Sequence, residues 1–209
     1  MHVPQPARRR SRWSIAVKNV TITLFLALIL LAQDSLAAER YVIDTRGQHA
    51  FIQFRIPHLG FSWLYGRFND FDGEFTFDPA DPAASSVEVS IRTASIDSNH
   101  QDRDEHLRGE DFLNTASFPE SGFRSTAFTP LGENRYRLEG ELSLLGRTAP
   151  ITIDVTEIGA GTDPWGGFRR GFEGTTTLTL ADWGIDYDLG PSAREVELTL
   201  SIEGIRQDG

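Results

Sequence analysis

The sequence contains no cysteine, and its single lysine, Lys18, lies near the N-terminus. Without cysteine the chain has no disulfide bond, no thiolate nucleophile and no thiolate metal site. Beyond residue 18, chemistry that needs a lysine amine, such as Schiff-base formation or a P-loop, is absent as well. The net charge of −10 argues against nucleic acid and anionic membrane surfaces as partners, because both recruit basic patches.

The first 37 residues carry the three-part pattern of a secretory signal peptide. A head rich in arginine precedes an apolar run at 20–32, and Ser35-Leu36-Ala37 supplies the small residues that a signal peptidase reads. The run is shorter than the roughly 20 residues that a transmembrane helix needs. We therefore predict a cleaved signal peptide (1–37), a single mature domain (38–209) with a net charge of −14, and a periplasmic location. The sequence leaves open whether export uses the Sec or the twin-arginine route.

From Ala50 to Ile202 apolar and polar residues alternate with a period of two. About eight such runs, separated by turns that contain proline or glycine, predict strands with one dry and one wet face, and hence an antiparallel sheet. The residues expected to face inward are Phe54, Phe75, Val89, Leu142, Phe172, Leu180 and Leu198. Those expected to face outward are Gln53, Glu74, Glu88, Glu141, Glu197 and Thr199.

One segment, from Ser98 to Asn114, breaks the alternation and is rich in helix-forming residues. Ser98 and Gln101 fit a capping box, and Gly109 suits the end of a helix. We predict one short helix from about Ser98 to Arg108, beside an opening of the fold. Leu107 and Phe112 should turn toward the interior.

Eight antiparallel strands can close as a barrel or stack as a sandwich. The chain has 14 phenylalanines against four tryptophans and four tyrosines, and many of the phenylalanines share the inward parity. A barrel of this size can hold a small ligand, whereas a sandwich core does not need a surplus of large rings. The pattern favours a barrel with an apolar cavity, although each phenylalanine taken singly also fits an ordinary core.

Catalytic and metal-binding motifs are weak. No G-x-S-x-G motif occurs. His100 and His106 flank acidic residues, but positions i and i+6 do not share a helix face, so a solvated acidic helix is the simpler interpretation. We expect no cofactor and no metal. The alternative to a binding protein is an enzyme that acts on an amphiphile with His58 or His106 and nearby carboxylates.

The segment from His58 to Phe68 concentrates aromatic residues and glycines between two runs of alternation. Such a composition is costly to expose in a mere connector. It either lines a ligand site or forms a well-packed strand corner, and the sequence leaves both open.

Motifs along the whole mature chain resemble those of the YceI-like family of bacterial periplasmic proteins, also called polyisoprenoid-binding proteins. They are YVID (41–44), HAFIQF (49–54), HLG (58–60), GRFNDFDG (66–73), DEHL (104–107), DFL (111–113), FP (118–119), the strand at 140–146 and DPWGG (163–167). The resemblance implies an all-β, eight-stranded antiparallel lipocalin-like barrel with one short helical insertion and an elongated apolar internal cavity. It also implies an isoprenoid ligand, such as a polyprenyl or quinone-type lipid, or another long-chain amphiphilic lipid, and it brings no catalytic residues.

The expected ligand-binding residues follow from the inward parity and from the family motifs. They are Phe54, His58, Trp63, Phe68, Phe75, Val89, His106, Leu107, Phe112, Leu142, Trp165, Phe172, Leu180 and Leu198. Moving dozens of carbons out of water at roughly 0.8 kcal/mol per methylene would exceed the affinity ceiling of about 18–21 kcal/mol. We therefore expect transient exchange with a donor in the inner membrane. The oligomeric state is left open, a dimer included.

The charge of the chain favours an uncharged head group on the ligand, such as a quinone, over a diphosphate. The expected hydrogen-bonding residues near a barrel mouth are His58, His106, Trp63 and Trp165. An anionic head group would instead need arginines such as Arg55, Arg103 or Arg108.

Overall fold

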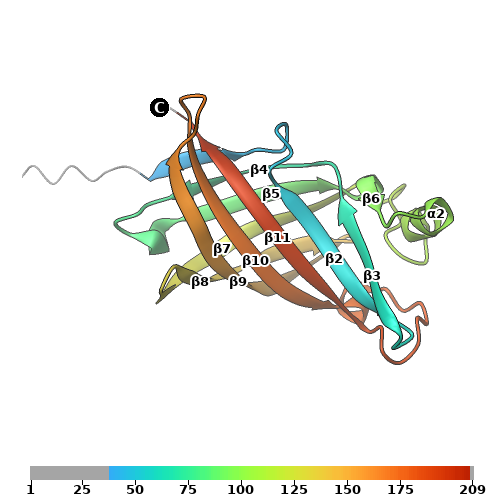
Figure 1. The fold of residues 1–209 in the computed structure, drawn as a ribbon. Helices are drawn as coiled ribbons and strands as arrows, with labels where there is room; N and C mark the ends of the chain where they lie inside the picture. The colour runs from blue at the N-terminus through green and yellow to red at the C-terminus, as the bar shows by residue number, and fades with distance from the viewer. Residues whose placement is uncertain (1–37, 208–209) are drawn as a thin grey trace, which may run out of the picture. The chain divides into compact units, whose positions relative to one another are not determined.

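Eight long antiparallel strands, three of them interrupted once, close into the barrel of Figure 1. The structure is a computed structural model that describes residues 38–207, so the predicted signal peptide lies outside the described residues. The strands are β1 (Glu39–Ile43), β2 (Phe51–His58), β3 (Ser62–Phe68), β4 (Phe71–Phe77), β5 (Ser86–Arg92), β6 (Ile96–Asp97), β7 (Glu120–Gly132), β8 (Arg135–Leu144), β9 (Arg147–Thr162), β10 (Phe168–Thr179) and β11 (Glu195–Arg206). The described helices are α2 (Gln101–Arg108) and the short 3₁₀ helices η1 (Pro82–Ala84), η2 (Thr93–Ser95) and η3 (Leu180–Trp183).

Strand pairing shows how eleven segments make eight strands. β1 and β2 both pair with β11, and on their other side β1 pairs with β4 while β2 pairs with β3. β5 then pairs with β4, and β6 with β3. Each of β1/β2, β3/β4 and β5/β6 is therefore one long strand with a break, and β7 to β11 follow as successive antiparallel neighbours. The predicted eight-stranded antiparallel barrel is confirmed.

The two ends of the barrel are built differently. The β4–β5, β7–β8 and β9–β10 connections lie at one end, together with the start of β1 and the end of β11. We call it the arginine end, after Arg170 and Arg206. The other, the helix end, carries the β2–β3 and β8–β9 turns, α2 and the connection from η3 to β11, and lies to the right in Figure 1.

The predicted inward and outward faces of the strands are confirmed except at Leu180. The residues predicted to face inward that are buried or packed on the core are Phe54, Phe75, Val89, Leu142, Phe172 and Leu198. The residues predicted to face outward are exposed, apart from Glu197, which is half-buried against Arg55. β10 ends at Thr179 and Leu180 opens η3, so Leu178 is the last inward residue of that strand; Leu180 is half-buried and lies in neither the core cluster nor the cavity lining.

The predicted helix exists but begins later than Ser98. Its N-cap is His100, whose Nδ1 accepts a hydrogen bond from the Arg103 N–H. Ser98 does not cap the helix because its backbone N–H and its hydroxyl both donate to the buried carboxylate of Asp104. Gly109 ends the helix as expected.

The aromatic segment from His58 to Phe68 is more than a connector between strands. It forms the β2–β3 turn and the whole of β3. Leu64, Gly66 and Phe68 are partly buried on the inner side, whereas Trp63 and Tyr65 are exposed on the outer side. Gly66 occupies an inward position of β3 without an apolar side chain, so the period of two was not recognised in this segment.

Close approach of phenylalanine rings to glycines lets the barrel interior hold many rings. Gly66 pairs directly with Phe54, and a Cβ atom on Gly66 would lie 2.2 Å from Cζ of the Phe54 ring. A Cβ on Gly204 would lie 2.4 Å from the Phe75 ring. Since non-bonded carbon atoms pack at about 3.5–4.0 Å, both positions require glycine.

We expect Gly66→Ala to lower the free energy of unfolding by about 1–3 kcal/mol in urea denaturation, because the new methyl group overpacks against Phe54. Gly159→Ala is the matched control, since no atom lies within 4 Å of its Cβ position. Adding Phe54→Leu should reduce the cost of Gly66→Ala. An equal cost in both backgrounds would contradict this account.

Candidate functional site

A cavity of about 150 Å³ lies inside the barrel. Of the predicted ligand residues, those that line it are Phe75, Val89, Leu142, Phe172 and Leu198. Its polar lining side chains are Thr76, Ser85, Ser86 and Thr176, and none of its lining residues in the described part of the chain is charged. Such a space favours a hydrocarbon over any polar guest.

The size of the cavity limits what fits without rearrangement. An apolar cavity of about 150 Å³ holds a guest of the size of benzene. The interior as it stands therefore accommodates only a short piece of a prenyl chain. A longer chain requires side chains at one end of the cavity to move.

A second apolar cluster closes the helix end of the interior. Phe54, Ile96 and Leu113 are buried there, and Phe68 and Leu107 pack against them. Three predicted ligand residues, Phe54, Phe68 and Leu107, thus lie in this plug and do not line the cavity.

Phe112 and His106 lie on the helical insertion, next to the plug. Phe112 is buried, and its ring centre lies 5.0 Å from those of His106 and Tyr187. The His106 ring nitrogen Nε2 lies 3.0 Å from the carboxylate of Asp111. These contacts attach the insertion to the loop that follows η3, away from the cavity lining.

The structure does not bring His58, Trp63 or Trp165 to the cavity. His58 is exposed at the end of β2, and Trp165 is 76% exposed in the β9–β10 turn. Trp63 faces outward, where the Arg55 guanidinium lies 4.1 Å from its ring centre. Each of the three lies at a strand end, in a turn or at an outward position of a strand. The family motifs alone do not show whether a residue faces inward or outward.

The arginines considered for an anionic head group are engaged elsewhere. Arg55 pairs with Glu197 on the outer surface. Arg103 donates to Ser98, and Arg108 donates to the carbonyl oxygens of Ala94 and Ile96.

A group of polar side chains inside the arginine end, the polar cluster, was not predicted from the sequence. Its members are Glu39, Tyr41, Tyr136, Glu157, Arg170 and Arg206. Arg170 donates to Glu157, and Arg206 donates to Glu39 over 2.7 Å. The hydroxyls of Tyr41 and Tyr136 donate to the same two carboxylates.

The protonation states of the polar cluster follow from burial and hydrogen bonding. Burial raises the pKa of Tyr41 and of Tyr136, so both keep their protons. Burial of Glu39 opposes its ionisation, but hydrogen bonds from Tyr41 and Arg206 outweigh it and lower the pKa of the carboxyl. The cluster is thus a set of ionised pairs with two neutral hydroxyl donors.

A signal for the polar cluster was present in the sequence. Arg170 lies two residues before Phe172 and shares its inward parity. Glu157 lies opposite Phe172, and the next residue, Ile158, has no partner on β10 because of a β-bulge. Glu157 lies before the bulge and continues the inward parity of Ile153 and Val155, so alternation places it inside the barrel without showing which partners it meets there.

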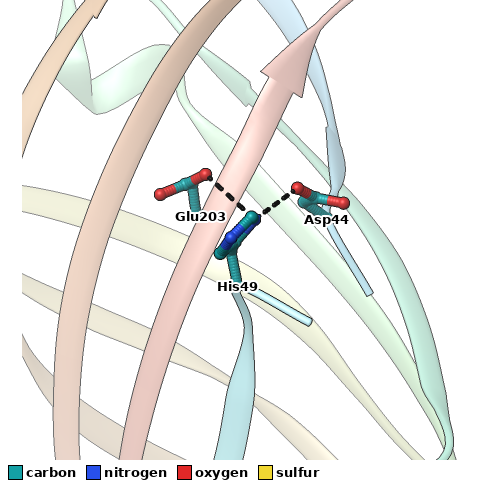
Figure 2. A group of neighbouring side chains, drawn as sticks. All are labelled: Asp44, His49 and Glu203. Carbon is teal, nitrogen blue, oxygen red and sulfur yellow. Dashed lines mark hydrogen bonds and ion pairs between the residues drawn. The ribbon is translucent and has the colours of Figure 1, made fainter. Parts of the chain in front are cut away.

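Asp44, His49 and Glu203 form the one group among the described residues whose ligand atoms are close enough to hold a metal ion (Figure 2). His49 lies between the two carboxylates, with Nδ1 2.9 Å from Asp44 and 3.8 Å from Glu203. Arg169 donates from Nη1 to the same oxygen atoms of Asp44 and Glu203, and from Nε to Asp163. A guanidinium therefore neutralises the carboxylates that a metal would need.

The same ion pairs anchor the break between β1 and β2. Burial opposes the ionisation of Asp44, but hydrogen bonds from His49, Arg169 and the Gly47 N–H outweigh it and lower the pKa of its carboxyl to about 2. The ionised form thus stabilises the fold.

We expect Asp44→Asn to reduce the free energy of unfolding at pH 7 by about 2 kcal/mol, from the difference between a pKa of about 2 and the ordinary 3.8. Because folding lowers this pKa, the stabilisation is present above about pH 4 and is lost as the pH falls through about 2. Urea denaturation from pH 7 to pH 2 should show the two proteins converging. Asp72→Asn, at an exposed position, is the control. A constant difference at all pH values would contradict the linkage.

A closed eight-stranded antiparallel barrel around an apolar cavity is a lipocalin-like architecture. The chain belongs to the YceI-like domain family, whose model matches residues 41–204. The resemblance drawn from the sequence motifs is thereby confirmed.

Relatives support the same assignment, and solved structures share the fold. The chain is 52% identical to a "UPF0312 protein" of Azotobacter vinelandii over 191 residues, which are 91% of this chain and 100% of the relative. It is 53% identical to the UPF0312 protein PA0423 of Pseudomonas aeruginosa over the same shares. The crystal structure of Burkholderia cenocepacia BcnA superimposes with a TM-score of 0.68 at 23% identity, covering 77% of this chain and 98% of that one. A polyisoprenoid binding domain from Saccharophagus degradans, implicated in plant cell wall breakdown, superimposes with a TM-score of 0.58 at 14% identity, covering 80% and 98%.

Within residues 38–207, no helix has the length and apolar character required to cross a membrane.

Proposed function

We propose that this chain is a periplasmic carrier that holds a long isoprenoid-type lipid, of the quinone or polyprenyl kind, in its barrel. The observation that carries the proposal is the cavity, which strand side chains from around the whole barrel line with apolar groups. The solved domain from Saccharophagus degradans, described as polyisoprenoid binding, supports the same class of ligand for this fold. The signal-peptide pattern of residues 1–37 supports the location.

The energetics of transfer favour exchange with a membrane over capture from water. Each methylene taken from water contributes roughly 0.8 kcal/mol, so a chain of dozens of carbons would not leave the barrel for water. The free energy of moving the chain from one apolar environment to another is close to zero, so this transfer is reversible. The proposed carrier therefore takes its ligand from, and returns it to, the inner membrane or a protein there.

The helix end supplies the route by which a long chain could enter. β6 pairs with β3 through only Arg67 and Phe68, and β7 begins at Glu120. The segment from Ser98 to Pro119 connects β6 to β7, and the side chain of Arg108 donates to the carbonyl oxygens of Ala94 and Ile96. Fewer backbone hydrogen bonds hold this part of the structure than hold the long ladders of β7 to β11, so it opens at lower cost.

Protein purified from its own periplasm and extracted with organic solvent should yield unmodified lipid in stoichiometric amount. Val89→Phe should lower the lipid content at least about tenfold, because the added ring fills a cavity that holds little more than one ring. Glu88→Phe, the same change at an outward position of β5, is the control. Mass spectrometry of the extract measures both. Absence of lipid from the unaltered protein, or recovery of a chemically altered product, would contradict a carrier.

Hydrogen exchange should test the proposed entry route. We expect the amides of α2 and of residues 109–119 to exchange faster than those of β7 to β11 in the lipid-free protein. Ligand should slow them, because a bound chain packs against Leu107 and Leu113 at the plug. Equal protection of the segment with and without ligand would mean that it is a fixed plug.

A further inference from the structure

Arg170 is the central residue of the polar cluster, and its donors are not all used. Its side chain is only 9% exposed. Nη1 donates to Glu157, and Nε lies 3.3 Å from the hydroxyl of Tyr41. Nη2 makes no hydrogen bond with the described residues, and the Glu39 carboxylate lies 3.7 Å from it, beyond hydrogen-bond distance. No fully buried side-chain nitrogen among the described residues lacks a partner, so Nη2 lies on the small accessible part of this side chain and keeps donor capacity for a further acceptor.

The polar cluster lies directly on the aromatic end of the cavity. The Arg170 guanidinium lies 4.2 Å from the ring centre of Phe77. Tyr41 stacks on Phe75 with ring centres 4.7 Å apart, and Tyr136 stacks on Phe128 at 4.5 Å. All three phenylalanines line the cavity. The interior therefore changes from hydrocarbon to hydrogen-bonding groups across a single layer of rings.

The formal charge of the polar cluster is zero. Its two arginines are matched by two glutamates, Glu39 and Glu157, which already accept from them. A diphosphate would bring its negative charge beside both carboxylates. An uncharged carbonyl oxygen would accept from Nη2 without displacing either pair.

We propose that the polar cluster is the head-group subsite of the barrel, and that it takes an uncharged hydrogen-bond acceptor of the ketone or quinone type through Arg170. The proposal rests on the proposed lipid-binding function, whose chain occupies the apolar cavity next to it. It also assigns the direction of the ligand: head at the arginine end, tail toward the helix end.

The experiment compares three probes that share one short isoprenoid tail. They are geranylacetone, the hydrocarbon in which a methylene replaces its carbonyl, and geranyl diphosphate. Each displaces a fluorescent apolar dye, N-phenyl-1-naphthylamine, from the mature protein. We expect geranylacetone to bind about tenfold more tightly than the hydrocarbon, as one hydrogen bond to a charged donor provides, and more tightly than the diphosphate.

The variants isolate the role of Arg170. Glu157→Gln with Arg170→Gln keeps the cluster neutral and should reduce the ratio of ketone to hydrocarbon affinity to about one. Arg170→Lys removes Nη2 but keeps the charge beside Glu157, and it should have the same effect if the double variant fails to fold. Glu88→Gln with Arg124→Gln, an exposed cross-strand pair, is the matched control and should keep the preference.

Three results would overturn the proposal, and they are distinguishable. If both variants of Arg170 still bind the ketone more tightly than the hydrocarbon, the polar cluster is not the head-group subsite. Tightest binding of the diphosphate would reverse the class of head group. Failure of every probe, the hydrocarbon included, to displace the dye from the unaltered protein would overturn the proposed function itself.

Discussion

The pairing of β11 with both β1 and β2 is the interaction on which the rest of the structure depends. It joins the last strand to the first and leaves the barrel without a long open edge. Because β11 contacts two segments of one interrupted strand, the break between them must be held in place. Arg169 does so by bridging Asp44 at the end of β1 to Glu203 on β11. The cluster that resembles a metal site is therefore part of the closure.

Closure also determines what the interior can be. Once the backbone groups of the wall are hydrogen-bonded within the sheet, the interior needs no polar partners, and apolar side chains fill it. Glycines such as Gly66 and Gly204 let rings lie flat against the wall. The result is a core that is nearly full, with about 150 Å³ left over. To hold a long chain, a carrier with this interior must move some of its own side chains out of the space that the ligand occupies.

Alternation in the sequence was sufficient to predict the strands and their faces, because one dry and one wet side leaves a period of two. The closed barrel was predicted from the surplus of phenylalanine and from the family motifs, since alternation alone also fits a sandwich. It failed where the backbone departs from that period. Leu180 continues the period of two in the sequence but begins a 3₁₀ helix. Ser98 fits the pattern of a helix cap, but its N–H and hydroxyl donate to Asp104. The cavity lining was predictable from parity, whereas the polar cluster was not. Arg170 carried the inward parity, but its role depends on partners from β1, β8, β9 and β11.

The difference between the two ends of the barrel gives its interior a direction. At the arginine end the side chains are a neutral set of ion pairs and hydroxyls, which is stable only while every partner stays in place. At the helix end the 98–119 segment connects β6 to β7, and its contacts include apolar packing, hydrogen bonds from Arg108, and hydrogen bonds from Thr93 to the carbonyl oxygens of Phe118 and Pro119. Opening the first would leave buried charges without partners, whereas opening the second exposes mainly hydrocarbon. An apolar tail presented at the helix end can replace that hydrocarbon as it enters, so the same contacts that close the barrel when it is empty are the ones that a lipid chain can substitute.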